Sequence, residues 1–337
     1  MSTTVLPIGK PIIAPWSYNG HIFSILSAGK QDYLPWLNSN FLTLELTQGM
    51  TRDDKVILFK YISCPFISDQ KINRKSIKHW HSDTIKFFKE CIDLNYYIYL
   101  FVDQFYVSCY YNYKKEHIPH DPMIFGYDDL KRVFFMADFM VAKDNFTRYQ
   151  TTEVPYDEIE QAYLNLPSEW DPNDGITLFQ YCVDVEESFN KELVKLELND
   201  YLNSRFSFEF YHSIMHSTYG KSVKNKYGLD IYNSIISSIN SLQEVEKLDF
   251  RWFHVIDIHK SLMVDKIKFM VDNSYISDKH YQSFEEIRQS SQVIRSLILK
   301  SQIKKVDSIS SKIVVLLENL REKEKISLKK VLIELED

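Results

Sequence analysis

The sequence predicts an α+β domain followed by an all-helical domain, with the boundary near residue 186. Two observations indicate this division. All ten prolines precede residue 186, as do most of the aromatic and β-branched runs typical of strands. From residue 186 onward there is no proline, and apolar residues recur at helical spacing. We therefore expect domains over residues 1–185 and 186–337.

In the first half of the chain, the sequence predicts strands that alternate with short helices. Val56–Ile62 and Tyr96–Val102 are apolar runs of strand length. Between them, Ser82 and Asp83 can cap a helix, whose apolar positions are Ile85, Phe88, Cys91 and Ile92. These elements predict a strand, a helix and a second strand in that order.

An antiparallel hairpin is predicted next. Residues 122–128 and 131–138 flank a turn at Asp128-Asp129-Leu130, and Asn145–Val154 offers a further strand. Pro155 should end that strand, and Tyr156–Leu164 reads as a short helix.

The second half predicts six helices, at roughly 186–203, 207–219, 229–243, 250–274, 279–303 and 308–335. The last two have apolar residues at i, i+3 and i+4 and can form a helical hairpin. Their apolar faces suit core packing or the docking of a partner helix. His212 and His216 lie one helical turn apart without the glutamate of a His-Glu-x-x-His motif, so we expect no metal there.

Composition and charge exclude several classes of function. The formal charge of −6 disfavours nucleic acid as a partner. The chain has no apolar run of about 18 residues and no secretion signal at its start, so we expect a cytoplasmic protein without a membrane partner. With 8 glycines and no phosphate-loop motif, no nucleotide or other cofactor is expected. The four cysteines are widely spaced and suit reduced thiols.

The candidate for chemistry is the hairpin itself. If it is centred near residue 129, His120 and Asp138 face each other, with Cβ atoms about 4.5–5.5 Å apart. A carboxylate that holds one imidazole nitrogen leaves the other free to transfer a proton, which is the base-and-orienter part of a catalytic triad. The alternative is a surface hairpin with a chance charge pair.

Three features together resemble a known family. They are the pattern His120-x-x-x-Ile-x-Gly-Tyr-Asp128, the Asp138 that closes the next strand, and the run Phe101-Val-Asp-Gln-Phe-Tyr106. They resemble the N-terminal domains of the butirosin biosynthesis protein H family, and the likeness continues through residues 34–40 and 249–260.

The resemblance implies a papain-like fold of the bacteriocin-processing cysteine peptidase type, with an antiparallel sheet. It also implies an acyltransferase of bacterial nonribosomal peptide or polyketide metabolism. The donor would be a thioester on an acyl or peptidyl carrier protein, and the acceptor a small-molecule amine. His120 fits the family's general base and Asp138 its orienting carboxylate. Residues expected to bind substrate are Asp103, Tyr106 and His117.

The family's nucleophile has no counterpart here. Its cysteine stands at the start of the first long helix, where this chain has residues 15–26 without a cysteine and without an upstream glutamine for an oxyanion hole. Ser17 takes that place, either as a nucleophile or as a helix N-cap. His120 can also deprotonate the acceptor amine directly. A non-catalytic scaffold, or a carrier-binding protein that has lost its nucleophile, is the alternative function.

Overall fold

The computed structural model describes residues 3–48, 55–61, 63–81, 83–142, 147–208, 225–241, 249–304 and 309–336. The chain forms two compact units, one of residues 1–31 and 64–186 and the other of residues 32–63 and 187–337. The expected boundary near 186 recurs, but residues 32–63 belong with the second unit. Most of the expected helix at 207–219, including His212 and His216, lies outside the described residues.

The first unit is built on an antiparallel sheet with the strand order β10-β9-β8-β5-β11-β4, and β1 pairs with β8. The strands are β1 (Thr3–Val5), β4 (Ile67–Asn73), β5 (Tyr97–Leu100), β8 (Met123–Asp128), β9 (Val133–Val141), β10 (Thr147–Pro155) and β11 (Gly175–Tyr181). A separate ribbon pairs β6 (Val102–Asp103) with β7 (Pro119–His120). The predicted antiparallel sheet is confirmed.

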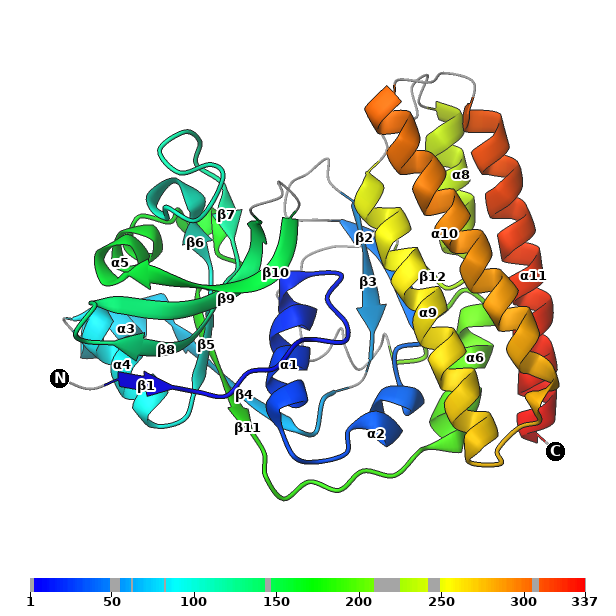
Figure 1. The fold of residues 1–337 in the computed structure, drawn as a ribbon, viewed down its shortest axis with the longest axis horizontal. Coiled ribbons are helices and arrows are strands. Elements are labelled where there is room, and N and C mark those ends of the chain that lie inside the picture. Colours follow the sequence, from blue (N-terminus) through cyan, green and yellow to red (C-terminus); the bar gives the residue numbers. More distant parts are fainter. Residues whose placement is uncertain are drawn as a thin grey trace. The chain divides into compact units, whose positions relative to one another are not determined.

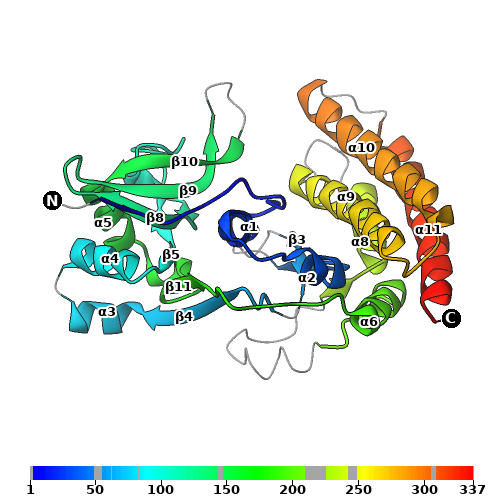
Figure 2. The ribbon, with the colours of Figure 1, turned by 60° about the horizontal axis from the view of Figure 1, so that its bottom comes forward.

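Helices cover both faces of this sheet (Figure 2). One face carries α1 (Ser17–Ala28), where His21 contacts Tyr99 and Tyr149. The other face carries α4 (Thr84–Asp93) and α5 (Tyr156–Leu164), where Phe134 contacts aromatic rings of both helices. Because neighbouring side chains of a strand point to opposite faces, Asp138 belongs with Phe134 and Met136 and not with the α1 face.

Local signals explain several of these elements. Asp83 caps α4 by accepting a hydrogen bond from the backbone N–H of Lys86 (2.9 Å). α5 has the predicted bounds, and it follows β10 at Pro155, as expected. Several elements of this unit were not predicted, among them β1, β4, α3 (Arg74–Trp80) and β11, which is buried on both faces at its start.

The second unit contains a sheet of three antiparallel strands beside its helices. The predicted helical character of the C-terminal region is confirmed, and within the described part of residues 186–337 the exception is the two-residue strand β12. β2 (Thr43–Gln48) pairs with β3 (Lys55–Lys60) on one side and with β12 (Lys226–Tyr227) on the other. The strand expected over Val56–Ile62 is therefore β3, and it belongs to a different sheet from β5. Two segments far apart in sequence complete this sheet, which local periodicity cannot indicate.

Long helices pack around that sheet, and α8, α9, α10 and α11 run alongside one another (Figure 1). α9 packs on α10 and on β3, while α11 packs on α6, α8 and α10. The predicted contact of the last two helices is thus confirmed. The helices are α2 (Leu34–Ser39), α6 (Lys191–Leu202), α8 (Asp230–Ser241), α9 (Phe250–Asp272), α10 (Tyr281–Lys304) and α11 (Ser310–Glu336).

Buried charges of the second unit bind the backbone at residues 38–42. The ammonium group of Lys266 donates to the carbonyls of Asn38 and Asn40, and Glu197 accepts from the N–H of Leu42. Burial lowers the pKa of Lys266 to about 7 and raises that of Glu197 to about 8. These side chains satisfy backbone groups that would otherwise be buried without a hydrogen bond.

Candidate functional site

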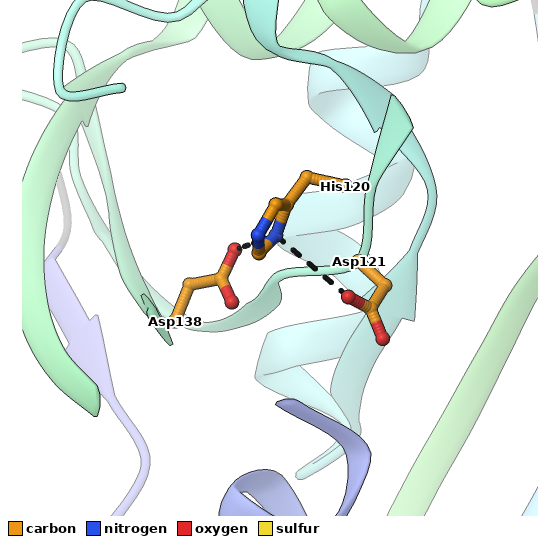
Figure 3. Close-up of side chains that lie close together, drawn as sticks. All are labelled: His120, Asp121 and Asp138. Carbon is orange, nitrogen blue, oxygen red and sulfur yellow. Dashed lines mark ion pairs between the residues drawn. The ribbon is translucent and has the colours of Figure 1, made fainter. Parts of the chain in front are cut away.

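His120 and Asp138 form the centre of the site, in the first unit (Figure 3). Nδ1 of His120 lies 2.7 Å from Oδ2 of Asp138, whose side chain is fully buried while that of His120 is 24% exposed. Among the described residues, no acceptor meets this Nδ1 at the angles of a hydrogen bond. The predicted contact is present, but charge attraction holds it and not an in-line hydrogen bond.

The predicted register behind this contact is wrong. It would place Ala137 opposite Asp121, whereas Ala137 pairs with Met123. The turn spans residues 129–132, and β8 has a bulge between Ile124 and Gly126. The contact arises because Asp138 lies one residue beyond the last pair of β9 with β8, while His120 pairs with Val102 on the separate ribbon.

Asp121 is a third member of the site that sequence reasoning missed. Its Oδ1 lies 3.7 Å from Nδ1 of His120, and its side chain is 25% exposed. Its Oδ2 accepts a hydrogen bond from the hydroxyl of Tyr99 (3.1 Å). Burial raises the pKa of this carboxylate, and the hydroxyl of Ser17 contributes to lowering it. Its position directly after His120 was the available signal. In a regular strand, however, that position would face away from His120.

The three groups shift one another's pKa values. Burial lowers the pKa of His120, but the charges of Asp138 and Asp121 outweigh it and raise this pKa to about 9. Burial raises the pKa of Asp121 to about 6, against the opposing charge of His120. Burial would also raise the pKa of Asp138, but the charge of His120 holds it below its ordinary value. Near pH 7.5 the site therefore holds an imidazolium between two carboxylates.

Asp138 is fixed by further partners. The hydroxyl of Tyr110 donates a hydrogen bond to its Oδ2, and the backbone N–H of Phe139 donates to its Oδ1 at 2.7 Å. The ring of Tyr110 also lies against that of His120, with centroids 5.1 Å apart. A fully buried carboxylate with these donors has the features of an orienting group.

A second histidine, His21, lies on α1 beside the cluster and was also missed. Its Nε2 is 2.8 Å from the carbonyl oxygen of Asp121 and must donate, because a carbonyl only accepts. Its Nδ1 therefore accepts from the hydroxyl of Tyr149, also at 2.8 Å. Burial lowers the pKa of His21 to about 4, so this ring is neutral. We assign it to positioning the backbone of Asp121.

Ser17 is the first residue of α1, but it is not the N-cap. Trp16 holds that position, and no side chain caps the helix there. The Ser17 side chain is buried. The expectation of a serine at the helix entrance is thus met, whereas the N-cap interpretation is wrong.

Asp103 supports His117 and not His120. Nδ1 of His117 lies 2.6 Å from Oδ2 of the buried Asp103, whose Oδ1 accepts from the backbone N–H of Phe105. The ring of His117 stacks on Phe105 and meets Tyr106 edge-on, with centroids 4.2 and 6.0 Å away. The three expected substrate-binding residues are therefore neighbours, and His117 has an exposed ring held in one orientation.

Three of the four cysteines do not supply an activated thiol. Burial raises the pKa of Cys64, Cys91 and Cys109 to about 12 in each case. The charge of Asp138 contributes to this shift at Cys109. A thiol in such surroundings is a poor nucleophile at neutral pH.

One group of side chains lies close enough together to share a metal ion. Within the described ranges, it is the only group of His, Cys, Asp or Glu side chains whose ligand atoms all lie within 4.8 Å of one another. Its members are His120, Asp121 and Asp138. Ligation by Nδ1 requires that this nitrogen carry no proton. The raised pKa of His120 means that it is protonated at neutral pH. A bound metal ion would displace this proton, so the same group suits either metal binding or proton transfer, and we develop the proton-transfer role.

The chain was compared with known proteins in two ways. No protein-family model matches the chain, and a search of curated proteins found no match. In the part of the chain that the structure describes, every helix is too short or too polar to span a bilayer.

Proposed function

We propose that this chain is an amide-forming acyltransferase in which His120, held by Asp138, transfers the proton. The observation that carries the proposal is their 2.7 Å contact, in which the carboxylate is fully buried and the imidazole is partly exposed. An orienting group is best protected from water, whereas a proton-transfer group must reach its substrate.

The substrates follow from the resemblance to the butirosin biosynthesis protein H family. The donor is a thioester on an acyl or peptidyl carrier protein, and the acceptor is a small-molecule amine of bacterial specialised metabolism. An antiparallel sheet with a long helix on one face is compatible with a papain-like fold. In this proposal Asp103, Tyr106 and His117 contact the substrate.

Direct attack by the amine is the route that we favour. The acceptor nitrogen attacks the thioester carbon, loses its proton to the enzyme, and displaces the thiolate. The alternative route passes through an acyl group on Ser17. The burial of Ser17, which is 7% exposed, disfavours it.

The test uses an N-acetylcysteamine thioester and a set of primary amines, with the amide product detected by mass spectrometry. We expect wild-type protein to form amide, His120→Ala to lose about 10²-fold or more of the rate, and Ser17→Ala to retain it. His79→Ala, at an exposed position on α3, is the matched control. Equal rates for His120→Ala and His79→Ala would refute the proposal, and a mass increase of the protein that Ser17→Ala abolishes would establish the covalent route.

A scaffold or carrier-binding protein is the second candidate function. It is favoured by the lack of a cysteine at the start of α1 and by the raised pKa values of the thiols at Cys64, Cys91 and Cys109. This function predicts that carrier protein binds with the same affinity to wild type and to His120→Ala, and that neither forms amide with any donor.

A further inference from the structure

We propose that Asp121 accepts the proton of the attacking amine, while His120 acts as the acid that protonates the leaving thiolate. This assignment rests on the acyltransferase function proposed above. It differs from the usual division of labour in a triad, in which the imidazole is the base and a carboxylate only orients it.

The side chains of Asp121 and Asp138 differ in their exposure to solvent. The side chains of Asp121 and His120 are 25% and 24% exposed, whereas that of Asp138 is fully buried. Only Asp121 and His120 can touch a substrate, and these two residues are adjacent in sequence and in space. The hydroxyl of Tyr99 holds the Asp121 carboxylate in place, so it is a fixed acceptor and not a mobile surface group.

The geometry around His120 suits an acid. Two carboxylates approach the same ring nitrogen, at 2.7 and 3.7 Å, and neither binds it along a hydrogen-bond axis. This arrangement stabilises a positive charge on the ring more than it selects one neutral tautomer. A neutral imidazole between two carboxylates would leave both negative charges without a counter-charge.

The reaction transfers one proton to Asp121 and one proton from His120. The amine nitrogen forms a bond to the thioester carbon, and the carbonyl electron pair moves onto oxygen. Asp121 takes one proton from the nitrogen. When the carbonyl re-forms, the C–S bond breaks and the sulfur takes the Nε2 proton of His120. Asp121 then releases its proton to water and His120 regains one from water, which their partial exposure permits.

The charges of the neighbourhood are consistent with these roles at neutral pH. With a pKa of about 6, Asp121 is ionised and can accept a proton, and with a pKa of about 9, His120 is charged and can donate one. Groups that face the pair are Ser17 and His21 on α1, Tyr99 on β5, Asp138 on β9, and Tyr110 in the loop before β7. Of these only Asp138 carries a charge near pH 7.5, since burial lowers the pKa of His21 to about 4 and raises those of the two tyrosines.

The decisive measurement is the pH dependence of kcat/KM for amide formation from the N-acetylcysteamine thioester. Because the active form needs ionised Asp121 and charged His120, we expect a bell-shaped profile with limbs near pH 6 and pH 9. If neutral His120 is the base, activity will instead rise with pH through about 9, and that result would overturn the assignment.

Two variants test whether Asp121 sets the acid limb of the pH profile. Asp121→Asn should lower kcat/KM by about 10²- to 10⁴-fold, with near-ultraviolet circular dichroism as the check on folding. Tyr99→Phe removes a donor to the ionised carboxylate and should move the acid limb to higher pH while the alkaline limb stays. Unchanged limbs in Tyr99→Phe, or a rate of Asp121→Asn within threefold of wild type, would refute the role of Asp121.

Refutation of the role of Asp121 is distinguishable from failure of the proposed function itself, in which wild-type protein forms no amide at any pH. A chelator control completes the design. Unchanged activity after treatment with EDTA is expected, and loss that added Zn²⁺ or Mn²⁺ restores would replace the acid–base assignment with a metal site.

Discussion

Replacing Asp138 by asparagine is expected to lower the pKa of His120 from about 9 to below its ordinary value of 6.5. At 2.7 Å and an effective dielectric constant of about 20, the lost attraction is about 6 kcal/mol. The rise of the His120 pKa in the folded protein, from 6.5 to about 9, corresponds to about 3 kcal/mol in favour of the charged ring. Because the lost attraction exceeds this net gain, burial should dominate in the variant.

The measurement is a nuclear magnetic resonance titration of the histidine ring carbon-bound protons between pH 5 and 10. The chain has 10 histidines, so a His120→Gln spectrum assigns the signal. Asp128→Asn, at the end of β8, is the matched control and should leave the His120 pKa unchanged. If His120 still titrates above pH 8 in Asp138→Asn, the charge of Asp138 does not set its protonation state and the reasoning fails.

Three further predictions concern stability, each measured by urea denaturation. Tyr110→Phe removes a buried hydrogen bond to Asp138 and should cost about 1–3 kcal/mol; no loss would mean that water replaces the hydroxyl. Gly20→Ala places a Cβ 2.5 Å from a ring carbon of Tyr149 and should lower the free energy of unfolding by about 1–3 kcal/mol. A gain in stability, which alanine gives at an open helix position, would contradict the close packing. Lys260→Met leaves the buried Glu324 without its ion-pair partner and should cost about 3–5 kcal/mol, and the double variant with Glu324→Leu should recover most of that loss.

Local sequence signals predicted the elements whose boundaries are set locally. The bounds of α5 follow from Pro155 and the apolar spacing after it, and Asp83 caps α4. The helices of the second half follow from long periodic runs without proline. By contrast, β2 is completed by β12, which has only two residues and lies far along the chain. A pairing of this kind is decided by tertiary contacts, so the transfer of residues 32–63 to the second unit could not be predicted.

The same distinction applies to the site. The contact of His120 with Asp138 was predicted for an incorrect reason, because the register is shifted and His120 lies on a separate ribbon, where it pairs with Val102. Asp121 was missed because alternation in a regular strand would point it away from its neighbour. Its role depends on Tyr99, which only the pairing of β5 with β8 brings close.

Asp121→Asn should stabilise the fold above pH 6, although the same change should lower kcat/KM. The folded pKa of Asp121, about 6, lies above its ordinary value of 3.8. The unfolded chain therefore ionises first, and stability falls as pH rises from about 4 to about 6. The shift corresponds to about 3 kcal/mol.

An asparagine keeps the shape of the neutral acid and avoids this cost, so a gain of about 1–3 kcal/mol at pH 8 is expected in urea denaturation, and none at pH 3.5. Asp138→Asn should have the opposite sign at pH 8, because the pKa of Asp138 is held below its ordinary value and its charge stabilises the fold. A loss of stability in both variants at pH 8 would mean that the two carboxylates have the same structural task. Opposite signs would identify Asp121 as a group kept in an unfavourable charge state, which is the expected condition of a catalytic base.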